Sequence, residues 1–357
     1  MNAPRTMRRE LYRMEGREAL ALLARSEVVH LATTTRDGAP VLRTVHGVVV
    51  DGRLCFHGAP AGEKSETVGR DAVVGVEEIV APIPSYYVDP ERACPATTYY
   101  LSVQVHGRLE AVEEPAAKAR VLAALMAKYQ PEGGHAPIEA DHPLYRAAVA
   151  GLMIVAISLD RVDGKAKLGQ NRKPGELAKV LELLWTRGDP GDPRAIELVR
   201  AANAGVPAPG FLRATFGGTL HCALGEDDVE PAVALLADAY WNAGIRPEAI
   251  AAAHRASPAW VGARDLAGKL VATARATGDR AKNAWIYDVA VAPAWRGRGV
   301  GKAVLRLLLD HPAVRGARRV WLGTKDAQGF YRAFGFAPED EVGLRSYAST
   351  TMVLARA

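Results

Sequence analysis

The chain has 357 residues, of which 49% are hydrophobic and 24% are charged, and its formal net charge is +5. This length predicts two domains with full-sized cores, and the composition excludes a disordered protein. No apolar run reaches the roughly 20 residues of a membrane helix, and the charged N-terminus lacks the apolar segment of a signal peptide. We therefore expect a cytoplasmic protein with no membrane partner.

The charge and histidine patterns argue against two kinds of site. The basic residues are spread along the chain without a basic block, and no helix-turn-helix pattern stands out, so no nucleic-acid partner is expected. His135 and His142 flank the loop "HAPIEADHP", but their spacing is not typical of a metal site. No metal is expected.

The first half is expected to be a barrel with added helices. After a helix near residues 16–24, apolar stretches alternate with the turn signals Asp37-Gly38 and Asp51-Gly52, which predicts an antiparallel meander. The strands are expected within residues 28–35, 41–50, 53–58, 97–112 and 151–168. A helix with proline at its start is expected over 115–129, and two more helices within 169–203. Strands at this spacing predict a small closed barrel.

A stretch rich in proline and glycine, residues 204–218, predicts a linker. We therefore expect one domain over 1–203, the linker, and a second domain over 219–357.

The second domain is expected to be a mixed α+β fold built around a sheet. The pattern predicts, in chain order, a strand over 219–225, a helix over 226–241, a hairpin over 260–276, a strand over 284–293, a turn and helix, a strand over 317–324, a short helix over 327–336 and a last strand over 347–355.

The turn in "VAVAPAWRGRGVGKAVLRLLL", Val289 to Leu309, carries the pattern R-x-x-G-x-G in Arg296, Gly299 and Gly301. Glycines let a ligand approach the backbone closely, and the first N–H groups of a helix lack intrahelical partners. With the helix dipole and nearby cations, such a turn fits a pyrophosphate. A solvated basic turn is the alternative, and a dinucleotide-binding motif fits worse because no βαβ pattern precedes it.

About residues 219–340 resemble the GCN5-related N-acetyltransferase (GNAT) family, through "YDVAVAPAWRGRGVGKAVL" and "VWLGTKDAQGFYRAFGF". The resemblance implies that acetyl-CoA binds along the strand, through the backbone of Val289 and Val291, and at the turn. The turn residues implied are Arg296, Gly297, Arg298, Gly299, Val300, Gly301 and Lys302. The segment "YWNAGI", residues 240–245, resembles the part of the family that covers the acceptor amine.

Two catalytic residues follow from this resemblance. Tyr331 matches the tyrosine that protonates the departing CoA thiolate, with a core aromatic as the alternative. Asp288 is the candidate general base, with a structural carboxylate as the alternative.

About residues 15–168 resemble the FMN-binding split barrels related to pyridoxamine 5′-phosphate oxidase, of the nitroimidazole-resistance and PaiB-like type. The resemblance rests on the stretch from "VVHLATTT" to "GEKSETV", on "LSVQVHGRLEAVEE" and on "DRVDGKAKLGQNR". It implies FMN, with haem or a deazaflavin as alternatives, and a homodimer formed through the barrel. The FMN phosphate is expected at Arg43, Thr44, His57, Gly58 and Lys64. Alternatively, Arg43 is a surface cation, His57 is a core histidine and Lys64 is solvated.

Together the two resemblances imply a bifunctional enzyme, in which an FMN-dependent oxidoreductase barrel is fused to an acetyl-CoA-dependent N-acetyltransferase. Its partners would be a small amine and a redox substrate. The alternatives are a flavin- or haem-binding regulator with an acetyltransferase module, or a chain in which one domain is inactive.

Overall fold

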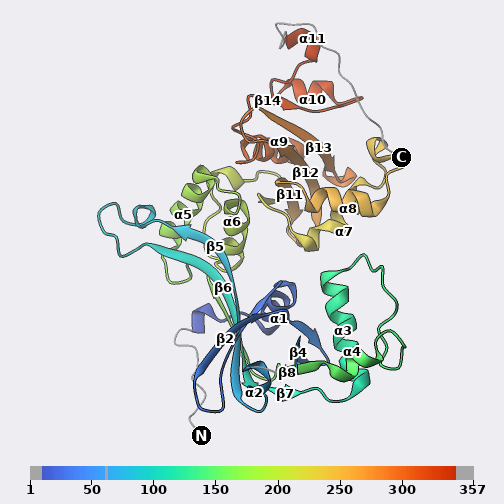
Figure 1. Ribbon diagram of the computed structural model, residues 1–357. Coiled ribbons are helices and arrows are strands. Elements are labelled where there is room, and N and C mark those ends of the chain that lie inside the picture. The colour runs from blue at the N-terminus through green and yellow to red at the C-terminus, as the bar shows by residue number, and fades with distance from the viewer. Residues whose placement is uncertain (1–9, 61–62, 343–357) are drawn as a thin grey trace. The chain divides into compact units, whose positions relative to one another are not determined.

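The computed structural model describes residues 10–60 and 63–342 (Figure 1). The chain divides into two compact units, residues Met1–Gly210 and Phe211–Ala357, and each is described by itself.

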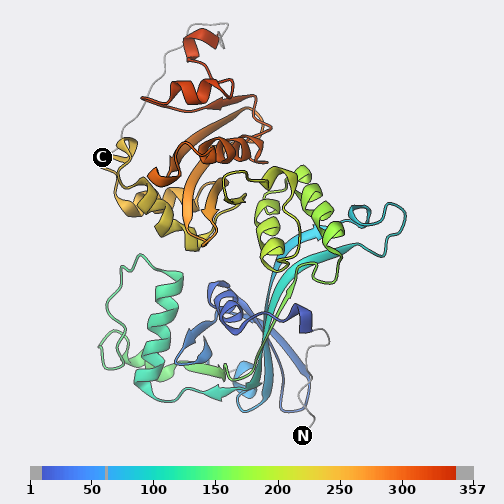
Figure 2. The ribbon, with the colours of Figure 1, turned by 180° about the vertical axis from the view of Figure 1, so that it is seen from behind.

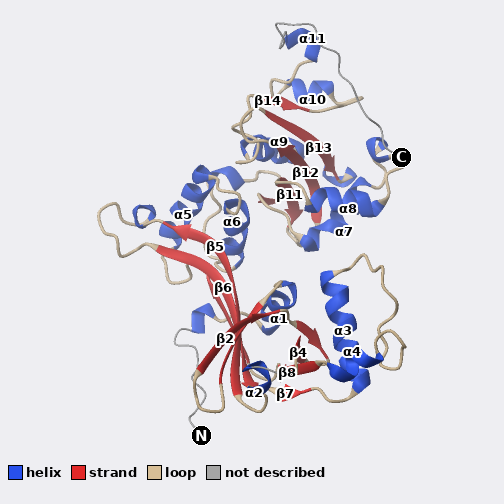
Figure 3. Ribbon diagram, in the orientation of Figure 1, coloured by secondary structure: helices blue, strands red, loops and turns tan. Residues whose placement is uncertain are grey.

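The first unit contains two antiparallel sheets (Figure 3). The five-stranded sheet has the order β2-β1-β5-β6-β9, with β1 (Val29–Thr34), β2 (Pro40–Val45), β5 (Asp71–Ile83), β6 (Thr97–Arg108) and β9 (Val162–Lys167). The four-stranded sheet has the order β3-β4-β8-β7, with β3 (Val48–Val50), β4 (Arg53–Gly58), β7 (Glu110–Ala111) and β8 (Met153–Ser158). This is the mixed helix-and-sheet fold with antiparallel sheets that the sequence predicts, although neither sheet closes on itself within the described residues.

The strand predicted over residues 41–50 is wrong in one respect, because it breaks at His46-Gly47. Strand β2 ends at Val45 in the first sheet, and β3 begins at Val48 in the second. A side chain at Gly47 would place its Cβ 3.1 Å from Leu54 Cδ1, so glycine lets the chain pass closely from one sheet to the other. The continuous meander is therefore split, whereas the β3–β4 hairpin is tight, with positive φ at both Asp51 and Gly52 as a type I′ turn requires.

The longest strand, β5, was not anticipated. It lies at the centre of its sheet and pairs with both β1 and β6. Its burial alternates over Ala72–Val76, as expected of a strand with one face in the core. The alternation in "AVVGV" was the signal that could have revealed it.

Helices pack on both sheets of the first unit. They are α1 (Gly16–Arg25), α2 (Glu63–Glu66), α3 (Pro115–Tyr129), α4 (Arg146–Gly151), α5 (Pro174–Arg187) and α6 (Asp192–Ala201). The helices predicted over 16–24 and 115–129 are confirmed, as is the pair within 169–203. The pair α5–α6 lies beside β5 (Figure 2), where Arg187 donates to buried Asp192 at 2.9 Å and to the Pro82 carbonyl at 2.7 Å.

The second unit is built on one sheet of order β10-β11-β12-β13-β14. Its strands are β10 (Gly218–His221), β11 (Ala259–Asp265), β12 (Leu270–Gly278), β13 (Asn283–Val291) and β14 (Arg319–Trp321). Its helices are α7 (Val229–Leu236), α8 (Pro247–Arg255), α9 (Val300–Asp310), α10 (Gln328–Arg332) and α11 (Glu339–Val342). The mixed α+β fold is confirmed. Helix α8 was not predicted, and the strand predicted over 347–355 lies outside the described residues.

Opposite faces of this sheet carry different side chains. On one face, alanines pair across β11 and β12, as in Ala259↔Ala276, and leave room for α9 to approach closely. On the other, Trp260 packs with Val229 and Ala232 of α7. The α7–α8 face is the one that also presents Arg275, because Trp260 and Arg275 are cross-strand partners.

No helix in the described parts of the chain combines the length and apolarity needed to cross a membrane.

Buried His311, just after α9, is fixed in its neutral form. Its Nδ1 accepts the Ala313 N–H at 3.1 Å, and its other nitrogen bonds the Cys222 backbone. Burial, with Arg280 and Arg315 nearby, lowers the pKa of His311 from 6.5 to about 3.

We predict that His311 makes the second unit acid-sensitive. The unfolded chain takes up this proton below about pH 6.5 and the folded chain only near pH 3, so stability is complete above pH 6.5 and falls as the pH drops toward 3. The loss is on the order of 5 kcal/mol at about 1.4 kcal/mol per pKa unit. Denaturant unfolding at a series of pH values should show a shallower acid slope for His311→Gln than for the wild type. Parallel slopes would contradict this role.

Candidate functional site

The last two strands in the order of the second sheet, β13 and β14, open into a fork. Strand β13 runs parallel to β14, but the two pair only from Asn283↔Arg319 to Trp285↔Trp321. Beyond Trp285, β13 continues to Val291 and remains paired with β12 on its other side. The edge of β13 that faces away from β12 therefore offers backbone donors and acceptors that β14 does not use.

A bulge lies where β13 leaves β14. The β12–β13 register shifts between Thr273 and Arg275, and Asp288 has a φ of +53°. Such a left-handed conformation costs a residue with a side chain roughly 1–2 kcal/mol. A bulge of this kind bends the strand and disrupts its ladder.

Two side chains hold the bulged Asp288 carboxylate. Arg275 Nε donates to Oδ2 at 2.5 Å, and Trp241 Nε1 donates to Oδ1 at 2.9 Å. Asp288 is only 8% exposed, so these bonds form in a medium where charge-assisted hydrogen bonds are strong. With both oxygens engaged, the geometry favours the structural alternative for Asp288 over that of general base.

The backbone beyond the bulge faces the open edge. Ala292 N–H donates to the Val271 carbonyl at 2.8 Å, so the groups of Ala292 point toward β12. Because direction alternates along an antiparallel strand, those of Val291 point into the fork. The Val291 carbonyl accepts Arg296 Nε at 3.1 Å, which ties the strand to the turn.

The turn places two glycines in left-handed conformations. Gly297 has a φ of +74° and Gly299, the N-cap of α9, one of +85°. The first intrahelical bond to the cap runs from Ala303 N to the Gly299 carbonyl, which leaves the N–H groups of Val300, Gly301 and Lys302 at the helix mouth. Arg298 lies 5.1 Å from the Trp295 ring centroid. This arrangement can bind an anion.

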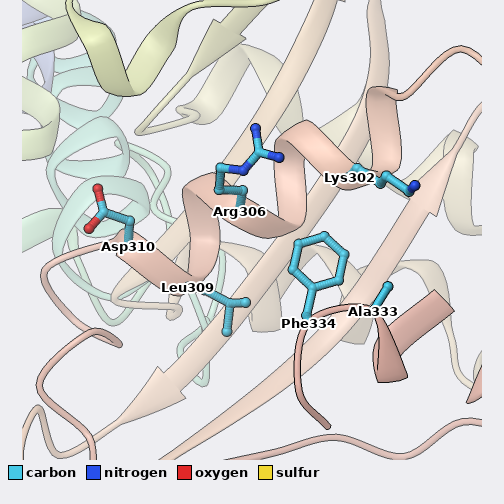
Figure 4. A pocket seen from close by; sticks show the side chains of 6 residues that line it. All are labelled: Lys302, Arg306, Leu309, Asp310, Ala333 and Phe334. Atoms are coloured by element: carbon cyan, nitrogen blue, oxygen red, sulfur yellow. The ribbon is translucent and has the colours of Figure 1, made fainter.

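A cavity of about 580 Å³ adjoins the same helix. Figure 4 shows its lining. Lys302, Arg306, Leu309 and Asp310 come from one side of α9, and Ala333 and Phe334 come from the segment after α10. The cavity thus begins at Lys302 in the first turn of α9 and combines two cations and one carboxylate with an aromatic ring.

Tyr331 lies on α10 in an aromatic setting. Its ring centroid is 5.0 Å from that of Phe330 and 5.9 Å from that of Phe336. Burial, and then the neighbours Tyr240 and Asp326, raise the pKa of Tyr331 above 10. The phenol therefore keeps its proton at neutral pH and can serve as an acid.

The segment 240–245 begins with the short 3-10 helix Tyr240–Asn242 rather than an α-helix. Tyr240 Oη accepts Lys325 N–H at 2.8 Å, and its ring packs edge-on against Trp241 at 5.0 Å. This segment therefore contacts both the Asp288 cluster and the chain leading to Tyr331.

The five phosphate candidates of the first unit lie on three elements. Arg43 and Thr44 are exposed on β2, whereas His57 and Gly58 end β4 in the other sheet. Val48↔Cys55 is the first β3–β4 pair, and His57 follows Cys55 by two residues on β4, where it pairs with Ile154 of β8. The candidates on β2 and on β4 therefore belong to different sheets. Lys64 lies in α2, and its side chain lies outside the described residues.

Several residues of the site were missed by sequence reasoning. Arg275, the exposed rings of Trp285 and Tyr287, and the partly buried ring of Trp321 lie on the α7–α8 face beside the fork. The only signal was the density of aromatic residues in "NAWIYD" and "RVW". Among the described residues, no group of three His, Cys, Asp or Glu side chains is placed to hold a metal ion.

Comparison with known families divides the chain in the same way. Residues 15–166 match the family described as pyridoxamine 5′-phosphate oxidase, and residues 228–336 match the acetyltransferase (GNAT) family. A curated relative from Oryza sativa subsp. japonica, named serotonin N-acetyltransferase 2, chloroplastic, is 36% identical over 94 residues, which are 26% of this chain and 47% of the relative. The chain spans less than half the length of the curated relatives it matches.

Two solved structures are similar to parts of the chain. One, described as the FAD and haem binding protein from Mycobacterium smegmatis, has a TM-score of 0.38 and 20% identity, and the match covers 47% of this chain and 79% of that one. Another, described as belonging to the GNAT family, is from Xanthomonas campestris pv. campestris. It has a TM-score of 0.31 and 31% identity, and the match covers 36% of this chain and 93% of that one.

We predict that Gly299 and Gly301 differ in their tolerance of a side chain. Gly299→Ala must keep a positive φ, so the helix mouth should distort and acetyl-CoA affinity should fall about tenfold, which corresponds to the roughly 1–2 kcal/mol of left-handed strain. Gly301 has ordinary φ, and an added Cβ would lie 3.4 Å from Val291 Cγ2, so Gly301→Ala should bind almost as the wild type does. Calorimetry measures both affinities, and a larger loss for Gly301→Ala would contradict the geometry.

Proposed function

Because residues 15–166 form a pyridoxamine 5′-phosphate oxidase-like domain and residues 228–336 form a GNAT domain, we propose that the chain is an acetyl-CoA-dependent N-acetyltransferase of a small amine, fused to a flavin-binding domain. The observation that carries the transferase proposal is the fork between β13 and β14, which leads to the helix mouth at Gly299.

The fork and the turn fit acetyl-CoA in three parts. The N–H groups of Val300, Gly301 and Lys302, with Arg298, bind the diphosphate. The backbone of Val289 and Val291 pairs with the pantetheine arm, which is an extended chain of amides. Lys302 and Arg306, in the cavity beside Phe334, bind the phosphorylated adenosine. Each contact matches a polar group of the substrate to a backbone or cationic group of this chain.

The reaction joins the nitrogen of a neutral amine to the acyl carbon and breaks the carbon–sulfur bond. Tyr331 donates its phenolic proton to the departing sulfur, and the proton lost by the amine passes to solvent. Asp288 holds the bulge, and so orients the β13 backbone toward the thioester. Positioning and one proton transfer are the contributions of this chain. The name of the rice relative supports acetyl transfer to nitrogen.

We propose FMN for the first unit. Arg43 and Thr44 on β2, with His57 and Gly58 on β4, would supply cationic, hydroxyl and backbone groups for its phosphate, and Lys64 in α2 is the remaining candidate. The flavin ring would supply the redox chemistry, and haem or a deazaflavin are the other cofactors to be distinguished. A homodimer through this unit and a redox substrate remain predictions, as does a functional link between the two sites.

Tyr331→Phe tests the transferase proposal. With acetyl-CoA and an accepted amine, we expect kcat to fall about 100-fold, a typical contribution of a general acid. Because burial raises the pKa of Tyr331 from its ordinary value near 10, the wild-type kcat should not fall between about pH 7 and 9 through loss of this acid. CoA release followed with a thiol reagent measures both. A variant that keeps its kcat within a factor of about two would show that Tyr331 is a core aromatic.

A visible absorption spectrum and mass spectrometry of the co-purifying compound test the flavin proposal. FMN should be found, and Arg43→Ala should weaken its binding by roughly tenfold or more, as expected for a lost charge-assisted bond. Arg120→Ala is the matched control, because Arg120 is an exposed arginine of the same unit paired with Asp51 at 3.3 Å. A colourless protein that takes up no flavin on reconstitution would contradict this proposal.

A further inference from the structure

Three aromatic rings form a row on the α7–α8 face of the second sheet. The ring centroids of Trp285 and Trp321 are 6.0 Å apart with an interplanar angle of 12°, and those of Trp285 and Tyr287 are 6.2 Å apart at 25°. Trp285 is 41% exposed and Tyr287 is 39% exposed. We call Trp285, Tyr287 and Trp321 the aromatic row. Exposed large rings gathered in this way are more often used for recognition than for the core.

The row lies at the closed end of the fork. Trp285↔Trp321 is the last paired position of β13 and β14, and Tyr287 immediately precedes the bulged Asp288. An acceptor molecule lying on the row would therefore reach the point where the β13 backbone becomes available to a thioester. The row is thus continuous with the transferase site.

A cavity of about 520 Å³ adjoins the row at the start of β13. Trp285 and Trp321 line it together with Thr277, Asn283, Asp279 and Glu339, among others. Its size is that of a site for a small organic molecule.

The rim of this cavity is acidic. Hydrogen bonds from the Asn283, Ala281 and Lys282 backbones lower the pKa of Asp279, so that carboxylate is charged at neutral pH. Glu339 adds a second acidic group. Lys282 also acts on Asp279, and Arg319 is the cross-strand partner of Asn283, but the residues that line the cavity include two acids and no cation. The field at the rim therefore favours a positively charged ligand.

We propose that the acceptor is a small primary amine that carries a flat aromatic ring, and that the aromatic row binds this ring while the amine points toward the fork. The inference deepens the proposed transferase function and rests on it. Parallel protein rings beside an open cavity suit offset stacking with a planar ligand, and the acidic rim attracts the protonated amine from solution. An aliphatic amine would gain only the free energy of burying its apolar surface, without the added contribution of stacked rings.

Two amines of equal charge and nearly equal size provide the test, 2-phenylethylamine and 2-cyclohexylethylamine. With CoA present, the wild type should bind 2-phenylethylamine about tenfold more tightly than 2-cyclohexylethylamine, because stacked rings add stabilisation to that of burying apolar area. With acetyl-CoA, it should acetylate 2-phenylethylamine with a correspondingly higher kcat/KM. Calorimetry measures Kd without requiring turnover.

A pair of variants separates flatness from bulk. Trp285→Phe keeps an aromatic ring and should keep the tenfold preference for 2-phenylethylamine. Trp285→Leu, with an apolar side chain that is not flat, should reduce that preference to about twofold or less, and Trp321→Leu should do the same. The control is Leu266→Ala, because Leu266 is exposed on the β11–β12 turn of the same unit. Thermal unfolding checks that each variant is folded.

The outcomes distinguish this inference from the function on which it rests. Equal affinities for the two amines, tighter binding of an aliphatic diamine, or no binding of either test amine would overturn the aromatic acceptor even if acetyl-CoA is bound and used. Failure to bind acetyl-CoA would overturn the transferase function, while the ratio of the two Kd values would still test the row.

Discussion

The Asp288 carboxylate, held between Arg275 and Trp241, is the interaction on which the second unit's site depends. Asp288 adopts a left-handed conformation in the middle of a strand, a strained arrangement that persists only when its surroundings determine it. The ion pair with Arg275 and the hydrogen bond from Trp241 hold Asp288 in this conformation. Leaving either charge buried alone would be far more costly than the backbone strain, so the bulge is retained.

This one cluster connects the parts of the site. Trp241 neighbours Tyr240, which accepts a bond from Lys325 on the way to Tyr331. Arg275 lies over Tyr287, the end of the aromatic row. The same carboxylate therefore shapes the open β13 edge and fixes neighbours of both Tyr331 and the row. A substitution at Asp288 is expected to affect binding and catalysis together, which distinguishes a positioning residue from a general base.

The sequence predicts those features whose cause is local. The turn at Asp51-Gly52, the helix over 115–129 and the glycine turn before α9 each depend on residues within a few positions of one another. The two families could also be recognised from contiguous motifs. By contrast, the aromatic row requires the pairing of Trp285 with Trp321, 36 positions apart, and the role of Asp288 requires Arg275 and Trp241. Cross-strand register decides these contacts, and no local pattern specifies it.

Both units interrupt a regular ladder, but by different physical means. In the first unit, Gly47 lets the chain change sheets because an added Cβ would crowd Leu54 Cδ1 at 3.1 Å. In the second, a buried charge pair holds a left-handed aspartate where the register of β13 with β12 shifts. Because the neighbours of Gly47 are close-packed, only a small residue fits at that position. A buried ion pair, by contrast, is destabilised mainly when one of its two charged partners is removed. The first break is therefore sensitive to added volume and the second to removed charge.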